Sequence, residues 1–245
     1  MFNFKLIAAT ILVCCATLTL PAQKKTPQPS AAAILENVEK GFEGISDFVT
    51  TIEAEVDMER VRVPKMKATM YFKKPDKVHF SSSNFAMLPR EGVMLNPAHL
   101  RQRYNPELLG VDTIDGKSLY KLQLTPKEPR SRPSQLQVWV DPNTWTIARM
   151  ESTPYQGRII HVAFTYSLEA NKFWLPSTMQ ASFELAARDT MSRELNLDIP
   201  NPDEQMQRPR PMRSGNITVK YLDYKVNVGL SDDVFEKQEG AAKVK

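Results

Sequence analysis

The stretch FVTTIEAEVDMERVRVPKMKATMYFKKPDKVHF, from Phe48 to Phe80, decides the fold of this 245-residue chain. Its first half alternates: the even positions are apolar, with Thr50 as the one exception, and most odd positions carry acids. The alternation returns from Met66 to Phe72, and on the other parity, from Lys65 to Lys73, three of the five residues are lysines. A period of two predicts half-buried β-strands, so two strands are expected here.

An antiparallel hairpin that turns near Val61–Val63 would place the acidic face of the first strand opposite the lysines of the second. Cross-strand pairs of opposite charge stabilise such a hairpin and fix its register. We therefore expect a long, curved antiparallel sheet that begins in this stretch and has a methionine-rich concave side.

The composition fits one globular domain. Hydrophobic residues make up 42% and charged residues 24% of the chain, which has no repeat of solenoid period. The eleven methionines are a high number. Methionine fills irregular apolar space and adapts to varied apolar partners, so these residues are either ordinary core or contacts to an apolar ligand.

Residues 1–22 are typical of a bacterial secretory signal peptide, with Lys5 before a short apolar run and Ala22 at the expected cleavage site. The mature chain, 23–245, would then contain no cysteine, because Cys14 and Cys15 lie in the signal. Disulfides and thiolate sites are excluded on that interpretation, and we expect a periplasmic protein. The alternative is a lipoprotein signal, in which an acylated Cys15 anchors the chain to a membrane.

Helices are expected mainly at the start of the chain. Ser30 is a predicted N-cap for an amphipathic helix that ends near Phe42. The strand period then fails from Phe80 to about Lys117. Asn96-Pro97 and Asn105-Pro106 each place a capping side chain before a proline, so short helical turns are predicted at both places.

The rest of the chain predicts an antiparallel meander. Asp115-Gly116 and the run Asp141–Thr144 are turn signals between alternating segments, and further alternation continues to about Val228. About nine or ten strands indicate a mainly β fold: a highly curved antiparallel sheet or unclosed β-barrel, covered by the N-terminal helix and short helical loop segments. The proline-rich stretch at about 199–215 has no periodicity and is predicted to be a mobile loop.

Catalytic motifs are not found. His79, His99 and His161 are scattered, and the sequence contains no metalloprotease, nucleophile-elbow, phosphate-loop or dinucleotide-binding signature. We expect neither catalytic residues nor a metal site nor a cofactor. Basic residues gather at Lys127–Arg132 and Arg208–Arg213, which could attract anionic lipid headgroups or an acidic partner surface or simply be solvated loops. Nucleic acid is not expected, because aromatic residues are not interleaved with these basic runs.

Several segments together resemble the periplasmic lipoprotein carriers LolA and LolB, the outer-membrane lipoprotein-sorting family. They are the amphipathic helix before the first strand, then MKATMYFKKPDKVHF, YKLQLTPK, LQVWVDPNTWTIARM and the closing YLDYKVNVGLSDDVF. The resemblance implies an unclosed antiparallel barrel that wraps over helices and holds acyl chains in an apolar cavity. The partners that it implies are an acylated lipoprotein or lipid cargo, an inner-membrane release complex and an outer-membrane receptor.

The function that we expect is a non-enzymatic, monomeric carrier or binding protein for acylated lipoproteins or lipid-like ligands. The alternative is a regulatory module of the cell envelope that uses the same fold to bind a membrane-protein partner. The candidate cavity wall consists of apolar residues on the inward parity of the predicted strands: Ile52, Val56, Met58, Met66, Met70, Phe72, Val78, Phe80 and Met179.

Lys74 is the candidate latch at the cavity mouth. It continues the inward parity of Met70 and Phe72, so a lysine lies on the apolar face just before Pro75, where the strand should end. In the carriers the residue at this place is typically an arginine that holds a helical loop across the cavity. A lysine there either serves as a weaker latch or extends its charge to water, whereas Lys73 points outward and is expected to have no role.

Overall fold

The structure is a computed structural model that describes residues 28–58, 61–62, 64–81, 96–128, 135–152, 158–185 and 214–236. The predicted signal peptide over 1–22, with Cys15, lies outside these residues. The predicted mobile loop also lies outside them, except for Ser214 and Gly215, which begin the last strand. Among the described residues, no helix is long and apolar enough to cross a membrane.

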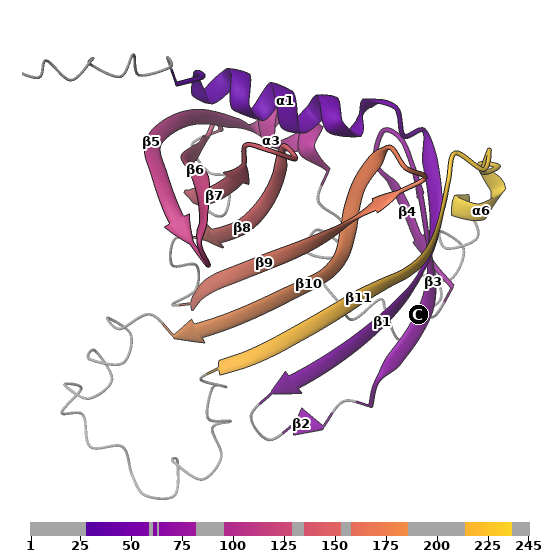
Figure 1. The fold of residues 1–245 in the computed structure, drawn as a ribbon. Coiled ribbons are helices and arrows are strands. Elements are labelled where there is room, and N and C mark those ends of the chain that lie inside the picture. The colour runs from indigo at the N-terminus through magenta and orange to yellow at the C-terminus, as the bar shows by residue number, and fades with distance from the viewer. Residues whose placement is uncertain are drawn as a thin grey trace, which may run out of the picture.

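Along the described residues the order is a helix, four strands, a short helix, seven strands and a final helical turn (Figure 1). The helices described are α1 (Ala31–Glu43), α3 (Pro97–Arg103) and α6 (Asp233–Glu236). The strands are β1 (Asp47–Met58), β2 (Val61–Arg62), β3 (Met66–Lys73), β4 (Lys77–Phe80), β5 (Tyr104–Ile114), β6 (Lys117–Pro126), β7 (Leu136–Asp141), β8 (Thr146–Ser152), β9 (Arg158–Glu169), β10 (Phe173–Leu185) and β11 (Ser214–Val226).

The strands form one antiparallel sheet in the order β4-β3-β1-β11-β10-β9-β8-β7-β6-β5, and β2 pairs with β1 beside this path. β4 and β5 are the two edges and do not pair with each other, so the sheet is curved but unclosed. Figure 1 shows α1 lying across the mouth of the curve, above β5–β8. The predicted fold class is confirmed.

The hairpin of β1 and β3 has the predicted register. Glu53 pairs with Lys67, and the Lys67 Nζ–Glu53 Oε1 distance is 3.1 Å. Lys65 and Glu55 make a second ion pair, also at 3.1 Å. Both pairs are exposed, and exposed pairs contribute at most about 1 kcal/mol each, so they select the register more than they stabilise the sheet.

The predicted helical turn at Asn105-Pro106 is wrong, and the predicted loss of strand period up to Lys117 is wrong with it. Both residues lie in β5, where Pro106 pairs with Leu124 of β6. Proline lacks an N–H donor but is tolerated on a strand with only one neighbour, and β5 is an edge strand. The other predicted turn is confirmed: Asn96 caps α3 by accepting a hydrogen bond from the Ala98 N–H at 3.1 Å.

Thr50, the polar exception in β1, lies at an irregularity of the sheet. Between the pairs Val49–Lys225 and Thr51–Leu222, β11 contains one residue more than β1. The buried Thr50 hydroxyl donates a hydrogen bond to the Leu222 carbonyl at 2.7 Å. A backbone acceptor at this bulge is thereby satisfied, which an apolar side chain in the same place could not do.

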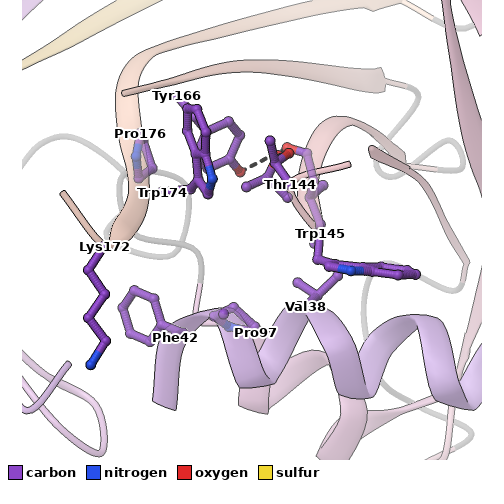
Figure 2. A pocket seen from close by; sticks show the side chains of 12 residues that line it. Val38, Phe42, Pro97, Thr144, Trp145, Tyr166, Lys172, Trp174 and Pro176 are labelled. Atoms are coloured by element: carbon purple, nitrogen blue, oxygen red, sulfur yellow. Dashed lines mark hydrogen bonds between the residues drawn. The ribbon is translucent and has the colours of Figure 1, made fainter. Parts of the chain in front are cut away.

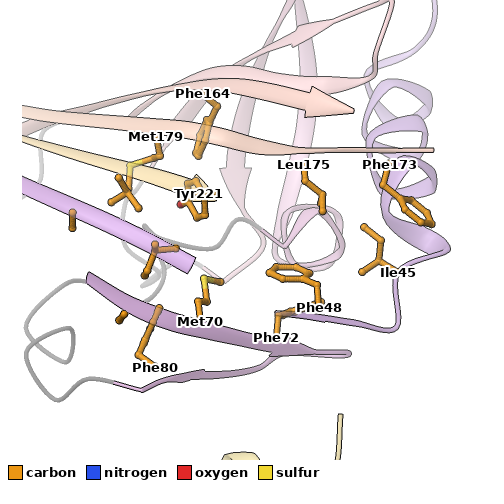
Figure 3. Close-up of a cluster of buried hydrophobic side chains, with 14 of the residues drawn as sticks. Ile45, Phe48, Met70, Phe72, Phe80, Phe164, Phe173, Leu175, Met179 and Tyr221 are labelled. Carbon is orange, nitrogen blue, oxygen red and sulfur yellow. The ribbon is translucent and has the colours of Figure 1, made fainter. Parts of the chain in front are cut away.

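The interior consists of two apolar clusters. The strand cluster joins the concave faces of β1, β3, β4 and β9–β11 (Figure 3), and its buried members are Ile45, Phe48, Ile52, Ala54, Val56, Ala68, Met70, Phe72, Phe80, Phe164, Phe173, Leu175, Met179, Val219 and Tyr221. The helix cluster packs α1 and α3 against β5–β8, and its buried members are Ile34, Leu35, Val38, Leu100, Tyr104, Leu122, Leu124, Leu136, Val138, Val140 and Ile147.

A C-terminal clasp, residues 227–230, fastens the end of β11 to the start of β1. The buried carboxylate of Asp47 accepts hydrogen bonds from three successive backbone N–H groups, those of Val228, Gly229 and Leu230, at 2.7–3.2 Å. Asn227 and Gly229 have positive φ angles of 56° and 75°, and such conformations turn successive N–H groups toward one anion. The side chain of Asn227 adds two hydrogen bonds, from the Ser46 N–H at 2.7 Å and to the Gly44 carbonyl at 2.9 Å, but the three N–H groups of 228–230 share the one carboxylate.

Replacing Asp47 by Asn should destabilise the protein, because an amide has one acceptor oxygen and turns an NH₂ group toward backbone donors. We expect Asp47→Asn to lower the free energy of unfolding in urea by about 1–3 kcal/mol. Asp57→Asn, at an exposed position of the same strand, is the control and should change it by less than about 0.5 kcal/mol. Equal losses in the two variants would contradict a special role for the Asp47 carboxylate.

Candidate functional site

The predicted cavity-wall residues lie together in the strand cluster. Six of them are buried there, namely Ile52, Val56, Met70, Phe72, Phe80 and Met179, and Met66 and Val78 pack against them while partly buried. The side chain of Met58 lies outside the described part of the structure. The cluster brings these residues together as closely packed core (Figure 3), and their contact with a ligand stays a prediction.

An apolar pocket lies elsewhere, between the second half of α1 and the sheet (Figure 2). Its volume is about 90 Å³. The lining comes from α1, α3, the β7–β8 turn and the β9–β10 hairpin: Val38, Gly41, Phe42, Pro97, Thr144, Trp145, Thr146, Ile147, Tyr166, Lys172, Trp174 and Pro176. Three aromatic rings besides Phe42 surround it, so its chemistry is that of an apolar site with few polar groups.

A bulge in β10 shapes the sheet side of the pocket. Pro176 pairs with Tyr166 and Thr178 with Thr165, so Ser177 is an extra residue in β10. Proline cannot donate to a neighbouring strand, and bulges are where a sheet accommodates it. The Pro176 carbonyl accepts a hydrogen bond from the Tyr224 hydroxyl at 2.8 Å. In Figure 1 β10 bends along its course toward the end of α1, which carries the β9–β10 turn to the pocket.

The β7–β8 turn supplies a constrained tryptophan. Trp145 has a positive φ of 53°, a conformation that costs a residue with a bulky side chain about 1–3 kcal/mol. It is held there by a hydrogen bond from its N–H to the Asp141 carbonyl at 2.8 Å and by stacking on Tyr120, with ring centroids 6.2 Å apart. Such strain persists only where the surrounding structure imposes it, and here the residue forms a pocket wall.

The polar groups inside the pocket are internally satisfied. The Tyr166 hydroxyl donates to the Ile147 carbonyl at 2.9 Å, which joins β9 to β8 across the pocket (Figure 2). The Thr144 and Thr146 hydroxyls are 2.7 Å apart and hydrogen-bond to each other. Burial raises the pKa of Tyr166 and of the neighbouring Tyr221. Both phenols are therefore neutral at physiological pH, and the pocket floor carries no charge.

Two glycines of α1 differ in what surrounds them. A Cβ atom at Gly41, which lines the pocket, would have nothing within 4 Å. A Cβ atom at Gly44, the C-cap, would lie 2.9 Å from Cε1 of Phe173. The absence of a side chain at Gly44 therefore allows the β9–β10 hairpin to approach the end of α1.

Lys74 lies at the end of α1. Its ammonium group donates hydrogen bonds of 2.8 Å to the Phe42 and Glu43 carbonyls and lies 5.6 Å from the centroid of the Phe42 ring. These carbonyls are among the last in the helix, where a cation also interacts favourably with the helix dipole. Partial burial lowers the pKa of Lys74, while the carboxylates of Glu43 and Glu39 act in the opposite direction. β3 ends at Lys73, as predicted.

The sequence prediction that Lys73 has no role is wrong, because its side chain makes two polar contacts. Its ammonium group donates to the Leu230 carbonyl at 2.8 Å and pairs with Asp232 at 2.7 Å. Lys77 also pairs with Asp232, and the two lysines lower the pKa of that carboxyl. Outward parity therefore did not mean lack of contact, because the C-terminal segment returns along this face of the sheet.

A second cavity of about 340 Å³ lies across β8–β11. Its lining is largely polar and includes Arg149, His161, Gln180, Ser182 and Asn216. His161 lies 3.2 Å from the Glu151 carboxylate. Within the described residues, no group of three or more His, Cys, Asp or Glu side chains is placed to hold a metal ion.

Sequence reasoning missed the aromatic lining of the pocket. Two signals were available. A proline within an alternating strand, Pro176, indicates a bulge, and Trp174 stands two residues before it. Trp145 directly follows the turn that begins at Asp141. What the sequence could not provide was the position of α1, which brings both tryptophans into one wall.

Comparisons with known proteins place the chain in a family. A family model described as "Uncharacterized protein" matches residues 95–239. The chain belongs to this family. No curated protein matches the sequence.

Solved structures identify the fold. A DUF1329 family protein from Desulfovibrio piger is 16% identical with a TM-score of 0.58, covering 85% of this chain and 98% of its own. A domain from Vibrio parahaemolyticus that carries the name of an outer membrane lipoprotein-sorting protein is 14% identical with a TM-score of 0.53, covering 84% and 96%. A LolA superfamily protein from Nitrosomonas europaea is 14% identical with a TM-score of 0.51, covering 85% and 98%. The predicted LolA-like fold is confirmed.

Substitutions at the two glycines should have opposite effects. Gly41→Ala should raise the free energy of unfolding by about 0.5–1 kcal/mol, because alanine is the better helix former and its methyl group meets open space. Gly44→Ala should lower it by about 1–3 kcal/mol, because its methyl group collides with Phe173. Urea denaturation measures both. A stable Gly44→Ala protein would mean that the hairpin does not pack closely on the end of α1.

Removing the Lys74 ammonium group should loosen the end of α1. In Lys74→Met we expect backbone amides of the last turns of α1 to exchange with deuterium about fivefold faster, because a charge-assisted hydrogen bond is lost. Lys67→Met, which removes only the exposed pair with Glu53, is the control. Hydrogen-exchange mass spectrometry makes the comparison, and equal protection of α1 in both variants would refute the role of Lys74.

Proposed function

We propose that this protein is a non-enzymatic carrier or binding protein for lipid-like ligands or acylated lipoproteins. The observation that carries the proposal is the aromatic-lined pocket between α1 and the sheet of a LolA-like fold. An apolar concavity with few polar groups is suited to hydrocarbon, and the pocket presents no arrangement of nucleophile and base.

The position of the pocket supports a site that can open. It lies where the two apolar clusters meet: Phe42 packs against the strand cluster, Val38 belongs to the helix cluster, and Met150 packs against both. A shift of α1 relative to β9 and β10 would therefore separate the two clusters without breaking either. Methionine side chains on the strand cluster could adjust to whatever entered.

The pocket is smaller than usual ligand pockets, so it would have to open to admit a ligand. Ligand pockets usually have volumes of about 300–1,000 Å³, and this pocket has about 90 Å³. Burial of hydrocarbon provides the driving force, at about 0.8 kcal/mol per methylene group, so a chain of about 12 carbons could gain close to 10 kcal/mol before the costs of ordering. With its pocket of about 90 Å³, the described structure corresponds in this proposal to the closed form.

Lys74 is proposed to set the ease of opening. Its two hydrogen bonds to α1 hold Phe42 against the pocket, so they must stretch or break when the end of α1 moves. A single ammonium group is a weaker fastening than a guanidinium group with its planar set of donors. This choice of residue favours a carrier that releases its cargo readily.

The cellular setting is proposed from the N-terminal sequence. A cleaved signal over 1–22 would deliver the protein to the periplasm, where a lipid or lipoprotein cargo would pass from a membrane complex to a receptor. Acylation at Cys15 would instead keep it on a membrane as a tethered receptor.

The proposal predicts that filling the pocket abolishes binding of apolar molecules. N-phenyl-1-naphthylamine, a neutral probe whose fluorescence rises in apolar surroundings, should bind the wild-type protein and be displaced by dodecanol. Gly41→Phe should weaken probe binding at least about tenfold, because the phenyl ring would occupy the pocket mouth that Gly41 leaves open.

Gly41→Ala is the matched control, because it changes the same position and the same helix but adds only a methyl group. It should bind the probe within about twofold of the wild-type affinity. Thermal unfolding of both variants establishes that each is folded. Probe binding that is equal in Gly41→Phe and Gly41→Ala, or absent from the wild-type protein, would refute a ligand site at this pocket.

A further inference from the structure

The pocket carries a lysine at its rim. Lys172, which is exposed, lies at the tip of the β9–β10 hairpin and lines the pocket. Three residues, Ala170, Asn171 and Lys172, join the two strands, because Glu169 pairs with Phe173. Ala170 and Asn171 have φ angles of 48° and 52°, and the Lys172 N–H donates to the Glu169 carbonyl at 3.0 Å. Positive φ angles at two successive residues are typical of turns whose twist matches that of the hairpin strands. The backbone of Lys172 is therefore fixed beside the pocket.

The Lys172 ammonium group makes no ion pair with the part of the chain that the structure describes. Among the described residues no carboxylate lies within 4.0 Å of its ammonium group, which lies 5.1 Å from the centroid of the Phe173 ring. The neighbouring acids have other partners: the Glu169 carboxylate accepts a hydrogen bond from the Ser167 hydroxyl at 2.7 Å, and Glu39 pairs with Arg101 at 2.6 Å.

The Lys74 ammonium group is not expected to bind an anionic ligand, because it already has partners. Its donors are directed at the carbonyls of Phe42 and Glu43, and the carboxylates of Glu43 and Glu39 compensate its charge. Lys40, in the last turn of α1, pairs with Glu36 at 2.7 Å. Of the three lysines near the end of α1, Lys172 is thus the one whose ammonium group can meet an anion from solution.

The pocket lining includes apolar side chains, a partly exposed tryptophan and the charged Lys172. Ile147 and the Phe42 ring are apolar, and the indole of Trp174, on the same hairpin as Lys172, is 39% exposed. In Figure 2 the Lys172 ammonium group lies beside the Phe42 ring, on the side away from Trp145. Tryptophan favours such boundaries because its ring is apolar and its N–H can meet water. Apolar, partly exposed and positively charged side chains together match a molecule with a hydrocarbon tail and an anionic headgroup.

We propose that the ligand of this pocket is an anionic single-chain amphiphile whose carboxylate or phosphate headgroup pairs with Lys172 while its tail enters between α1 and the sheet. This inference rests on the proposed function and adds the chemical class of the ligand. Carboxylate and phosphate share the chemistry that an ammonium group recognises, and an exposed lysine accepts either as a point charge.

Three amphiphiles of equal chain length test the headgroup: dodecanol, dodecanoate and dodecyl phosphate, each displacing N-phenyl-1-naphthylamine at pH 8 and below its micelle concentration. The wild-type protein should bind the better of the two anions about threefold to fivefold more tightly than dodecanol, as expected for one exposed ion pair. Half-molar salt should reduce this advantage, because it screens exposed charges. Whichever anion binds more tightly identifies the headgroup.

Lys172→Ala should lose the preference and bind the two anions no more tightly than dodecanol. Lys220→Ala is the control, because it removes an exposed lysine from β11 outside the pocket and changes the net charge equally. If the wild-type protein binds none of the three amphiphiles, the proposed function fails. If it binds all three equally, or if Lys172→Ala keeps the preference for anions, the headgroup inference fails and the proposed function stands.

Discussion

The Lys74 ammonium group joins the end of the first helix to the end of β3, and the arrangement of the pocket depends on this contact. The last carbonyls of a helix have no partners within it, so they take donors from elsewhere. Lys74 supplies two of them, at 2.8 Å each. With the end of α1 fixed, Phe42 faces the pocket and Gly44 meets Phe173 of the β9–β10 hairpin. The cation thus acts together with the buried apolar face of α1 and with the Asn227 amide, which donates to the Gly44 carbonyl at 2.9 Å.

The curvature of the sheet explains why a space exists there. A regular antiparallel sheet over a single apolar layer would give one continuous core. Here the register shifts beside Thr50 and after Pro176, and the polar groups at each shift are satisfied by the hydroxyls of Thr50 and Tyr224. Bulges increase the local bend of a sheet. The concave face is accordingly long enough to hold two apolar clusters, and the pocket forms where they meet.

Much of the fold could be predicted because local signals agreed with the final structure. The acidic and basic faces of the first hairpin pair as expected, and Ser30 and Asn96 cap their helices. The error at Asn105-Pro106 arose where a local signal had two physical meanings. An asparagine before a proline suits a helix start and also an edge strand, and the position of β5 in the sheet decided between them.

The candidate site was harder to predict for the same reason. Periodicity shows which side chains face inward, and it correctly grouped Met70, Phe72 and Met179 on one concave face. It does not show which inward side chains pack against each other and which leave a space, because that depends on elements distant in sequence. Trp145, Tyr166 and Trp174 come from separate strands and turns, and they share a wall only because α1 lies opposite them.

The sequence by itself determined the strand order of the first hairpin, the amphipathic helix, the turns and the apolar face, because each follows from the spacing of neighbouring residues. Tertiary structure alone decided the partners of Lys73, Lys74 and Asp47, and with them the location of the pocket. Their contacts join residues that are about 30 to 180 positions apart in the chain. No local period reports such contacts, because they exist only after folding has brought the end of the first helix and the C-terminal segment to the same end of β1 and β3.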